Sequence, residues 1–317
     1  MKILVTGGAG FIGSHLTDAL IKKGHQVTVW DNLNTGSKEN LNPAADFKKI
    51  DLKNFPKTAE LFWAGRFEAV FHLAAQTSVR KSVANPQEDA RDNILASLNL
   101  IELCKKNWLD SGSKNKFIFS STGGAIYGDT DKRPSDEELK ENPLSPYGIG
   151  KLAIDKYLNY YRKFFNLNCV SLRYANVYGP RQNPHGEAGV VAIFINKMIK
   201  GKQPLINGDG KQTRDYVHVD DVVRANLLAL EKNQAAGIFN VGTALETNVN
   251  QLFEKINKHF DNRFKKKHGP GLAGEQKTSC LLFKKIEKEL DWRPKIVLDK
   301  GIEQTWEWFL KKAKHER

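Results

Sequence analysis

Three glycines near the N-terminus restrict the fold of this 317-residue chain more than any other feature. Gly7, Gly10 and Gly13 stand at three-residue spacing. They follow the apolar run KILV and open a helical pattern that ends near Gly24. Glycines in such a strand–turn–helix unit let the backbone approach a pyrophosphate, and the helix N-terminus offers free N–H groups. Because glycines also form plain turns, the prediction of a dinucleotide site depends on this context.

Short apolar runs alternate with helical patterns through the first half of the chain. The predicted strands are residues 2–7, 26–31, 69–75, 116–121 and 168–176. The predicted helices include residues 13–24, 90–107, 145–165 and 218–231. This alternation indicates βαβ units and a parallel sheet. We therefore expect an α/β fold with a Rossmann-like, doubly wound parallel sheet and a smaller, interleaved C-terminal substrate lobe.

The pattern changes after Ala175, where loops lengthen and Gly and Pro become more frequent. We expect residues 1–175 to form the dinucleotide-binding domain and residues 215–242 to return to it. Residues 176–214 and 243–317 would then form the substrate lobe.

Composition excludes several classes of protein. Cys104, Cys169 and Cys280 lie far apart without a Cys-x-x-Cys or paired histidines, which argues against a disulfide framework or a metal site and favours a reducing cytoplasm. No apolar run is long enough for a membrane helix or a signal peptide, so we expect no membrane partner. The net charge of +13 is compatible with nucleic-acid binding, but the basic runs have the character of solvated helix faces, and no nucleic-acid motif is present.

Asp31 ends the second predicted strand, 18 residues after Gly13. A carboxylate at this place accepts hydrogen bonds from ribose hydroxyls and repels a 2′-phosphate, so the cofactor is predicted to be NAD. A turn or helix cap is the structural alternative for Asp31 and Asn32. Asp51 and Leu52 follow residues 47–50, FKKI, which would form the third strand along the chain, and an adenine edge could be recognised there.

Tyr147 and Lys151 stand four residues apart near the start of a predicted helix, with Ser145 suited to the N-cap and Pro146 to the first turn. Residues at this spacing share one helix face, so the ammonium can lie near the phenol. A free tyrosine titrates near ~10, and nearby positive charge favours its phenolate. The pair predicts a general base, although a chance pair on a surface helix has the same spacing.

Several further stretches complete the pattern. Residues 71–79 read FHLAAQTSV, residues 173–182 read RYANVYGPRQ and residues 214–222 read RDYVHVDDV. Together with the glycine turn and the Tyr–Lys pair, these stretches resemble the nucleotide-sugar branch of the extended short-chain dehydrogenase/reductase family, and within it the UDP-glucose 4-epimerases. The resemblance covers nearly the whole chain and implies NAD-dependent epimerisation of a UDP-sugar at C4.

The resemblance also implies the residues of the site. Those expected at the cofactor are Gly7, Gly10, Phe11, Ile12, Gly13, Asp31, Asn32, Asp51, Leu52, Leu73, Ala74, Ala75, Asn93, Tyr147 and Lys151. Those expected at the substrate are Thr122, Asn176, Val190, Arg214 and Ser279. Asp220 and Asp221 are interpreted as helix caps.

Residues 120–130 read SSTGGAIYGDT and hold only Tyr127 and Asp129 as ionisable groups. Dehydratases and decarboxylases that resemble this chain carry acidic residues beside the threonine, where Gly123 and Gly124 stand here. A glycine cannot protonate a leaving hydroxide, whereas epimerisation needs only a hydroxyl, which Thr122 supplies beside Tyr147. A Gly–Gly turn with incidental hydroxyls is the structural alternative.

Two positions bear on the substrate. Leu272 stands where related proteins carry a diphosphate-binding arginine, and Ser279 stands where some epimerases carry a tyrosine that restricts the pocket. A small residue at that place implies room for N-acetylated sugars.

Other functions stay open from the sequence alone. They are a UDP-uronate epimerase, a dehydratase or decarboxylase of a nucleotide sugar, and a non-catalytic dinucleotide sensor. The helices at 90–107 and 146–165 carry apolar residues on more than one face, and by resemblance these faces imply a homodimer.

Overall fold

The computed structural model describes residues 1–108, 115–185, 189–271 and 276–315. The strands are β1 (Lys2–Thr6), β2 (Gln26–Asp31), β3 (Asp46–Lys49), β4 (Ala69–His72), β5 (Lys116–Thr122), β6 (Cys169–Tyr174), β7 (Asn176–Tyr178), β8 (Ile206–Asn207), β9 (Thr213–His218), β10 (Gly237–Val241), β11 (Glu246–Asn248) and β12 (His268–Gly269). The longer helices are α1 (Phe11–Lys22), α2 (Phe55–Gly65), α5 (Ala96–Trp108), α7 (Pro146–Phe165), α8 (Val190–Ile199), α9 (Val219–Glu231), α10 (Val249–Asn257), α11 (Lys284–Leu290) and α12 (Leu298–His315). The short helical segments are η1 (Lys38–Asn40), α3 (Val79–Ala84), α4 (Pro86–Ala90), η2 (Arg91–Leu95), α6 (Gly123–Ile126) and η3 (Lys258–Phe260).

Seven parallel strands form the main sheet in the order β10-β6-β5-β4-β1-β2-β3. The chain order reverses between β1 and β4, and in open α/β sheets ligands bind at the carboxyl ends of the strands that flank such a reversal. The expected Rossmann-like fold is confirmed, and the five predicted strands all belong to this sheet.

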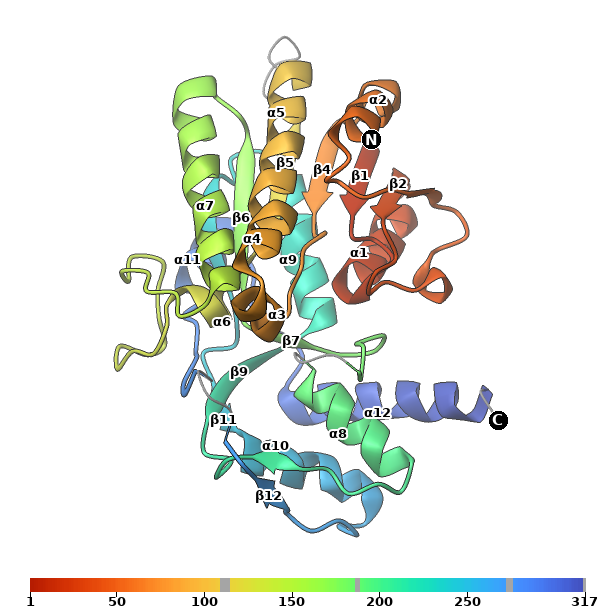
Figure 1. Ribbon diagram of the computed structural model, residues 1–317, viewed down its shortest axis with the longest axis vertical. Coiled ribbons are helices and arrows are strands. Elements are labelled where there is room, and N and C mark those ends of the chain that lie inside the picture. The colour runs from red at the N-terminus through yellow and green to blue at the C-terminus, as the bar shows by residue number, and fades with distance from the viewer. Residues whose placement is uncertain (109–114, 186–188, 272–275, 316–317) are drawn as a thin grey trace.

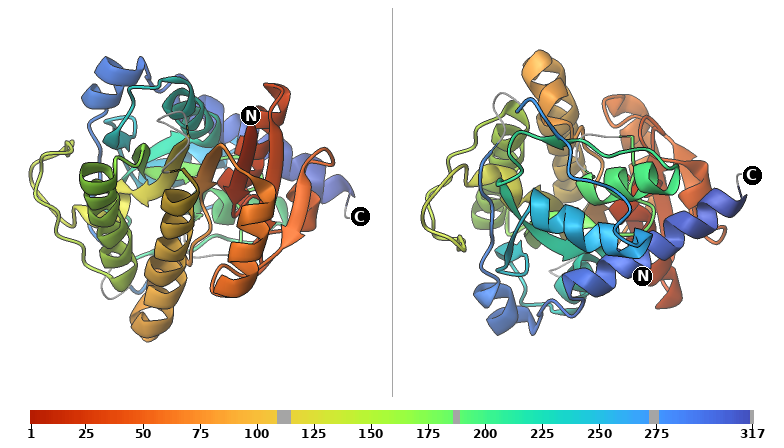
Figure 2. Two further views of the ribbon diagram at one scale, coloured as in Figure 1. Left: turned by 90° about the horizontal axis from the view of Figure 1, so that it is seen from above. Right: turned by 90° about the horizontal axis from the view of Figure 1, so that it is seen from below.

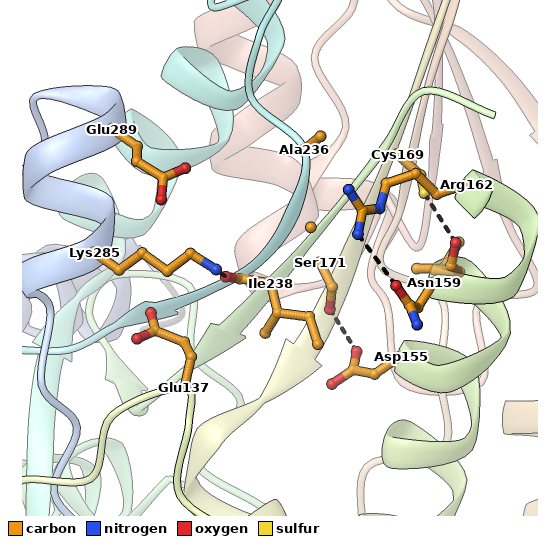
Figure 3. Close-up of a pocket in the computed structure, with 12 residues that line it drawn as sticks. Glu137, Asp155, Asn159, Arg162, Cys169, Ser171, Ala236, Ile238, Lys285 and Glu289 are labelled. Atoms are coloured by element: carbon orange, nitrogen blue, oxygen red, sulfur yellow. Dashed lines mark hydrogen bonds between the residues drawn. The ribbon is translucent and has the colours of Figure 1, made fainter. Parts of the chain in front are cut away.

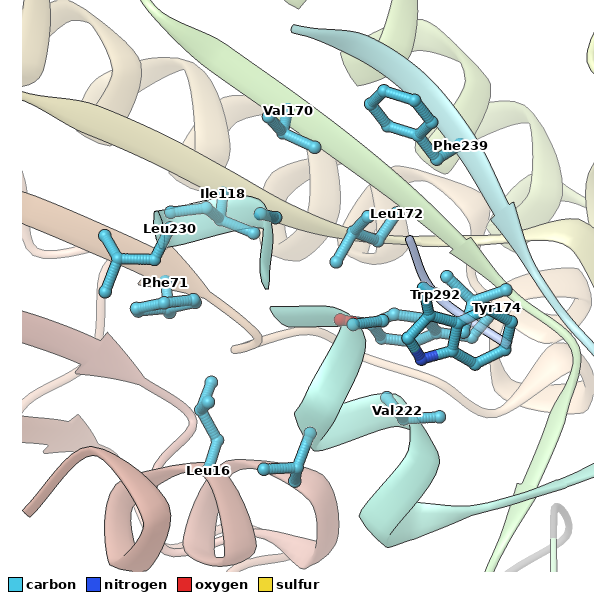
Figure 4. Close-up of a cluster of buried hydrophobic side chains, with 14 of the residues drawn as sticks. Leu16, Phe71, Ile118, Val170, Leu172, Tyr174, Val222, Leu230, Phe239 and Trp292 are labelled. Atoms are coloured by element: carbon cyan, nitrogen blue, oxygen red, sulfur yellow. The ribbon is translucent and has the colours of Figure 1, made fainter. Parts of the chain in front are cut away.

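Helices cover both faces of the main sheet (Figure 1). One face packs against α1, α9 and α11 through a core that includes Leu16, Val222 and Trp292 (Figure 4). The other face packs against α2, α5 and α7, and its core includes Phe62, Leu100 and Ile154. Helices α5 and α7 lie side by side on this second face in Figures 1 and 2.

The smaller lobe is built from chain segments that leave the main sheet and return to it. Strands β7, β9 and β11 form a second sheet, and β8 pairs with β12. Helices α8, α10 and α12 enclose a separate apolar core that includes Phe194, Phe253 and Phe309. Between these segments the chain forms α9 and then β10, which pairs with β6 at the edge of the main sheet.

Two local features differ from expectation. The predicted helix at 90–107 is not a continuous α-helix, because residues Arg91–Leu95 form a π-helical turn, a rare feature that occurs mostly at functional sites. The interpretation of Asp220 and Asp221 as N-caps is wrong. His218 is the N-cap of α9, and its side chain accepts a hydrogen bond from the Asp220 N–H group, while both aspartates lie in the first turn. Within the described residues, no helix is long and apolar enough to cross a membrane.

Candidate active site

The glycine turn between β1 and α1 packs against the segment that follows β4. Gly7 has φ +70°, and a Cβ atom there would lie 2.7 Å from the Ala74 nitrogen. A Cβ atom on Gly13 would lie 2.2 Å from the Gly7 carbonyl oxygen. The turn therefore needs glycine at both positions, and it places the backbone of Gly10, Phe11 and Ile12 at the carboxyl end of β1, where α1 begins.

Asp31 lies at the end of β2 and is 8% exposed. One carboxylate oxygen accepts a hydrogen bond from the Ala9 N–H group at 3.0 Å, and the other accepts one from the Leu33 N–H group at 2.8 Å. Burial raises the pKa of this carboxyl, and these two bonds oppose the rise. The carboxylate thus ties the glycine turn to the end of β2, next to the place predicted for the ribose.

The other residues predicted at the adenosine end have local roles as well. The Asn32 side chain accepts a hydrogen bond from the Asn34 N–H group, and the Asp51 side chain accepts one from the Lys53 N–H group. Leu52 is buried in the core beneath this edge of the sheet.

Leu73, Ala74 and Ala75 follow β4, and the amide of Asn93 holds the residue just after them. Asn93 Nδ2 donates to the Gln76 carbonyl at 2.9 Å, and Asn93 Oδ1 accepts from the Gln76 N–H group at 2.9 Å. Asn93 belongs to the π-helical turn η2, so this rare turn fixes the segment at the reversal point of the sheet.

The Tyr147–Lys151 pair lies at the start of α7, as predicted. Ser145 is the N-cap, its Oγ accepting from the Gly148 N–H group at 3.2 Å, and Pro146 is the first helical residue. The Tyr147 hydroxyl is hydrogen-bonded to Thr122, at the end of β5. Lys151 is 4% exposed, and its Nζ donates to the Ser120 carbonyl at 2.7 Å. Residues from β5 and α7 that are distant in sequence therefore meet at one place.

The two ionisable groups of the pair have opposite shifts. Burial raises the pKa of Tyr147 to about 12, although the residue as a whole keeps some solvent exposure. Burial lowers the pKa of Lys151 to about 8, and the charges of Asp155 and Asp89 oppose this change. The lowered phenol pKa expected from the Tyr–Lys spacing is absent here, because desolvation outweighs any effect of the ammonium.

Gly124 marks the point where three predicted substrate residues converge. A Cβ atom on Gly124 would lie 3.4 Å from Asn176 Oδ1, 3.8 Å from Ser279 Oγ and 3.9 Å from Thr122 Oγ1. Asn176 Oδ1 is buried and has no hydrogen-bond partner among the described residues. An unpaired buried amide oxygen beside two hydroxyls is suited to bind a polyhydroxylated ligand.

The remaining substrate predictions lie on the smaller lobe. Val190 is the first residue of α8, and Arg214 is on β9. The Arg214 guanidinium donates to the carbonyl oxygens of Gln276 and Lys277. It therefore holds the segment that leads to Ser279. Leu272 falls outside the described residues.

Sequence reasoning missed a buried polar network beneath the site. Arg173 is fully buried on β6 and donates to Asp155 at 2.8 Å and to the Tyr127 hydroxyl at 2.8 Å. Tyr127 in turn donates to Asn240 Oδ1 on β10 at 3.0 Å. Because Asp155 lies one turn after Lys151, the network fixes helix α7 to strands β6 and β10. In the sequence, the polar residues Tyr127 and Arg173, each next to apolar residues, were the signal that could have indicated this network.

A hollow of about 340 Å³ lies at the free edge of β10 (Figure 3); Asp155 is among the residues that line it, whereas Thr122, Tyr147 and Asn176 are not. Two charged side chains there bind backbone groups of that edge strand. Lys285 donates to the Ile238 carbonyl at 2.8 Å, and Glu137 accepts from the Asn240 N–H group at 2.7 Å. These side chains protect the edge from pairing with another strand.

The residues present fit a dinucleotide. The glycine turn joins the end of β1 to the start of α1 without side chains at Gly7, Gly10 and Gly13. A buried carboxylate, Asp31, stands at the end of β2, and Tyr147 is hydrogen-bonded to Thr122 at the end of β5. Fold and site together define a Rossmann-type enzyme with a short-chain dehydrogenase/reductase pair.

Comparison with known proteins agrees with this class. The NAD dependent epimerase/dehydratase family matches residues 3–242, and the chain belongs to this family. A crystal structure of UDP-glucose 4-epimerase with UDP-glucose from Thermotoga maritima is 47% identical, with a TM-score of 0.95 over 99% of this chain and 100% of that chain. The UDP-glucose 4-epimerase of Thermus thermophilus, in complex with NAD, is 39% identical, with a TM-score of 0.91 over 98% of this chain and 99% of that chain. A UDP-N-acetylglucosamine 4-epimerase from Methanobrevibacter ruminantium, in complex with UDP-N-acetylmuramic acid, is 35% identical, with a TM-score of 0.90 over 98% of both chains.

Proposed function

We propose that this protein interconverts the C4 epimers of a UDP-hexose, with UDP-glucose and UDP-galactose as the principal pair. The observation that carries the proposal is the meeting of Thr122, Tyr147 and Lys151 beside Gly124, which stands where an eliminating enzyme needs an acid. Bound NAD supplies the acceptor and donor of the C4 hydride. The glycine turn with Asp31 is proposed to hold its pyrophosphate and ribose.

Tyr147 is the proposed base for the proton of the sugar 4-hydroxyl, with Thr122 bridging the two groups. Burial holds the phenol protonated in the structure, so Tyr147 needs added positive charge before it can act at neutral pH. The Lys151 ammonium is fixed one turn away by the Ser120 carbonyl, and the oxidised nicotinamide ring of bound NAD would supply a second positive charge. Formation of the phenolate would then depend on a bound, oxidised cofactor.

Epimerisation requires the sugar to present both faces while the nucleotide stays in place. We therefore assign the anchoring of the diphosphate to the smaller lobe, where α8 begins at Val190 and Arg214 lies on β9. Asn176, with its unpaired oxygen, is assigned to the sugar or the pyrophosphate.

The test uses purified protein, UDP-galactose and NAD, followed by NMR without added reductant. UDP-glucose forming without net NADH supports the proposal. A stable keto product would indicate a dehydratase, and released CO₂ from a UDP-uronate would indicate a decarboxylase. Turnover of a UDP-uronate to its epimer would move the substrate to that class. No turnover and an unchanged cellular role in Tyr147→Phe would indicate a dinucleotide sensor.

Ser279 favours a second substrate pair, UDP-GlcNAc and UDP-GalNAc. Its side chain is small and lies near Gly124, so this wall leaves room for an N-acetyl group. Ser279→Tyr should lower kcat/KM for the N-acetylated pair far more than for the glucose pair. Equal losses for both pairs would contradict this assignment.

We also propose a homodimer formed through α5 and α7. Large apolar residues are exposed on α7 and in the turn η2 that precedes α5: Leu95 (55%), Ile149 (53%), Tyr157 (42%), Tyr160 (46%) and Phe164 (71%). Exposed apolar residues that gather in one region of a surface are typical of an interface, which supports the proposal. Phe164→Glu should yield monomers in size-exclusion chromatography with light scattering, whereas Val297→Glu, at an equally exposed position elsewhere, should not.

Two further expectations join the proposal. The three cysteines are free thiols and buried, which favours a reducing compartment such as the cytoplasm. Residues 1–175 with 215–242 are proposed as the NAD-binding unit, and 176–214 with 243–317 as the UDP-sugar-binding unit.

A further inference from the structure

The segment 276–282 lies between strand β9 and the loop that connects α6 to α7. On one side it follows β9, where the Thr213 N–H group donates to the Lys277 carbonyl and the Ser279 N–H group donates to the Thr213 carbonyl, at 2.9 and 3.2 Å. On the other side it meets the loop between α6 and α7. There the Ser135 N–H group donates to the Cys280 carbonyl at 2.9 Å, and the Leu282 N–H group donates to the Ser135 carbonyl at 2.8 Å.

Asp129 binds this segment at the two residues before Ser279. A single carboxylate oxygen, Oδ1, accepts hydrogen bonds from the Lys277 N–H group at 2.8 Å and from the Thr278 N–H group at 3.1 Å. The neighbouring Gly128 carbonyl accepts from the Gln276 side chain at 2.8 Å. Backbone N–H groups bound to a carboxylate form stronger hydrogen bonds than neutral pairs do.

The position of Asp129 in the chain connects this contact to the site. Thr122 and Gly124 precede it by only a few residues, on β5 and α6. Tyr127, between them and Asp129, is fixed by Arg173 and Asn240. The chain just before Asp129 is therefore held in place by buried hydrogen bonds, and the two residues that Asp129 binds directly precede Ser279.

We propose that Asp129 is a positioning residue that fixes the segment 276–281, and with it Ser279, over the sugar end of the site. The inference rests on the proposed function, because it assigns Ser279 to the wall of the sugar pocket. Under this proposal, the selectivity between UDP-glucose and UDP-GlcNAc depends on the Asp129 carboxylate, which acts through Ser279 and not by contact with the sugar.

Three variants separate this role from general stability. Asp129→Ala removes both hydrogen bonds, whereas Asp129→Asn keeps an acceptor oxygen at the same place. Asp136→Ala is the matched control, because Asp136 lies in the same loop and its Oδ1 accepts from the N–H groups of Glu138 and Leu139, neither of which belongs to the segment.

The first measurement is amide hydrogen exchange of the peptide that contains Lys277 and Thr278. It does not depend on activity, so it tests the contact even if the proposed function is wrong. We expect about tenfold faster exchange of these amides in Asp129→Ala, wild-type exchange in Asp136→Ala and intermediate exchange in Asp129→Asn. Unchanged exchange in Asp129→Ala would overturn the proposal.

The second measurement is the ratio of kcat/KM for UDP-glucose and UDP-GlcNAc. Loss of folded protein lowers both values equally, but displacement of Ser279 changes their ratio. We expect Asp129→Ala to change the ratio about threefold to tenfold, with most of the effect in KM and with NAD binding unchanged, and Asp129→Asn to restore most of it. Faster exchange with an unchanged ratio would overturn the positioning role. If Asp129→Ala exchanged faster but the wild-type protein turned over neither sugar, the contact would be supported and the proposed function would be rejected instead.

Discussion

Neighbouring glycines in α6 allow a sharp test of the sugar pocket. A Cβ atom on Gly124 would make ordinary contacts, the nearest being 3.4 Å from Asn176 Oδ1, so alanine fits there without moving its surroundings. A Cβ atom on Gly123 would lie 2.3 Å from a methyl carbon of Leu281, which is 1% exposed. The same substitution should therefore have different effects at the two positions.

Gly124→Ala should leave the free energy of unfolding equal to that of the wild type or raise it by up to about 1 kcal/mol, because alanine favours helix. Its methyl group would occupy space among three groups assigned to the sugar. One methyl or methylene in a binding pocket changes transition-state binding by about 1–3 kcal/mol, so kcat/KM should fall by about 10–200-fold. Gly123→Ala should instead lower the free energy of unfolding by about 1–3 kcal/mol through overpacking.

Both variants would be assayed by thermal unfolding and by NMR of UDP-galactose turnover. The comparison needs kcat/KM per folded protein, so that unfolding of Gly123→Ala is not counted as lost catalysis. If Gly124→Ala retained wild-type kcat/KM, the convergence of Thr122, Asn176 and Ser279 would not be the sugar site.

Three further outcomes are expected. Tyr147→Phe should lower kcat by about 10²–10⁴-fold without loss of NAD binding, as measured by turnover and by cofactor titration; a milder loss would assign the base elsewhere. Asp215→Ala should lower the free energy of unfolding, measured by denaturant titration, by about 3 kcal/mol or more, because this fully buried carboxylate accepts hydrogen bonds from the backbone N–H groups of Thr243, Ala244 and Leu281. A loss below about 1 kcal/mol would show that those N–H groups bind water in the variant. Because burial lowers the pKa of Lys151 to about 8, the turnover rate should fall as the pH rises through 8, and a rate that stays flat to pH 10 would contradict the assigned role of the ammonium. Between pH 8 and 10.5 only the unfolded chain still binds this proton, so the contribution of Lys151 to the free energy of unfolding should rise with pH over that range.

Local patterns in the sequence were sufficient to predict most of the main sheet and the helix α7. Apolar runs predicted five of the seven strands of the main sheet, because strands buried on both faces need continuous apolar side chains. Ser145 and Pro146 predicted the start of α7 correctly, because capping depends on neighbouring residues alone.

Contacts between distant segments could not be read in the same way. The sequence named Asn93 and Arg214, but not that one holds the Gln76 backbone and the other holds the carbonyls of 276–277. It also gave no sign that desolvation would raise the Tyr147 pKa, because burial at this point depends on how α6 and α7 pack. Each of these properties depends on tertiary packing rather than on spacing along the chain.

The return of β10 to the main sheet has a consequence for how the chain is made. Strand β6 ends at Tyr174, but its outer edge has no partner until residues 237–241 have been synthesised. In a nascent chain that stops between these points, the edge of β6 that β10 would cover has no partner strand. Unpaired strand edges of this kind favour aggregation. The smaller lobe is therefore not an appendage added to a finished sheet. Its first segments must leave the ribosome before the sheet can close, so premature termination or slow translation between residues 175 and 236 should produce an insoluble fragment rather than a free dinucleotide-binding domain.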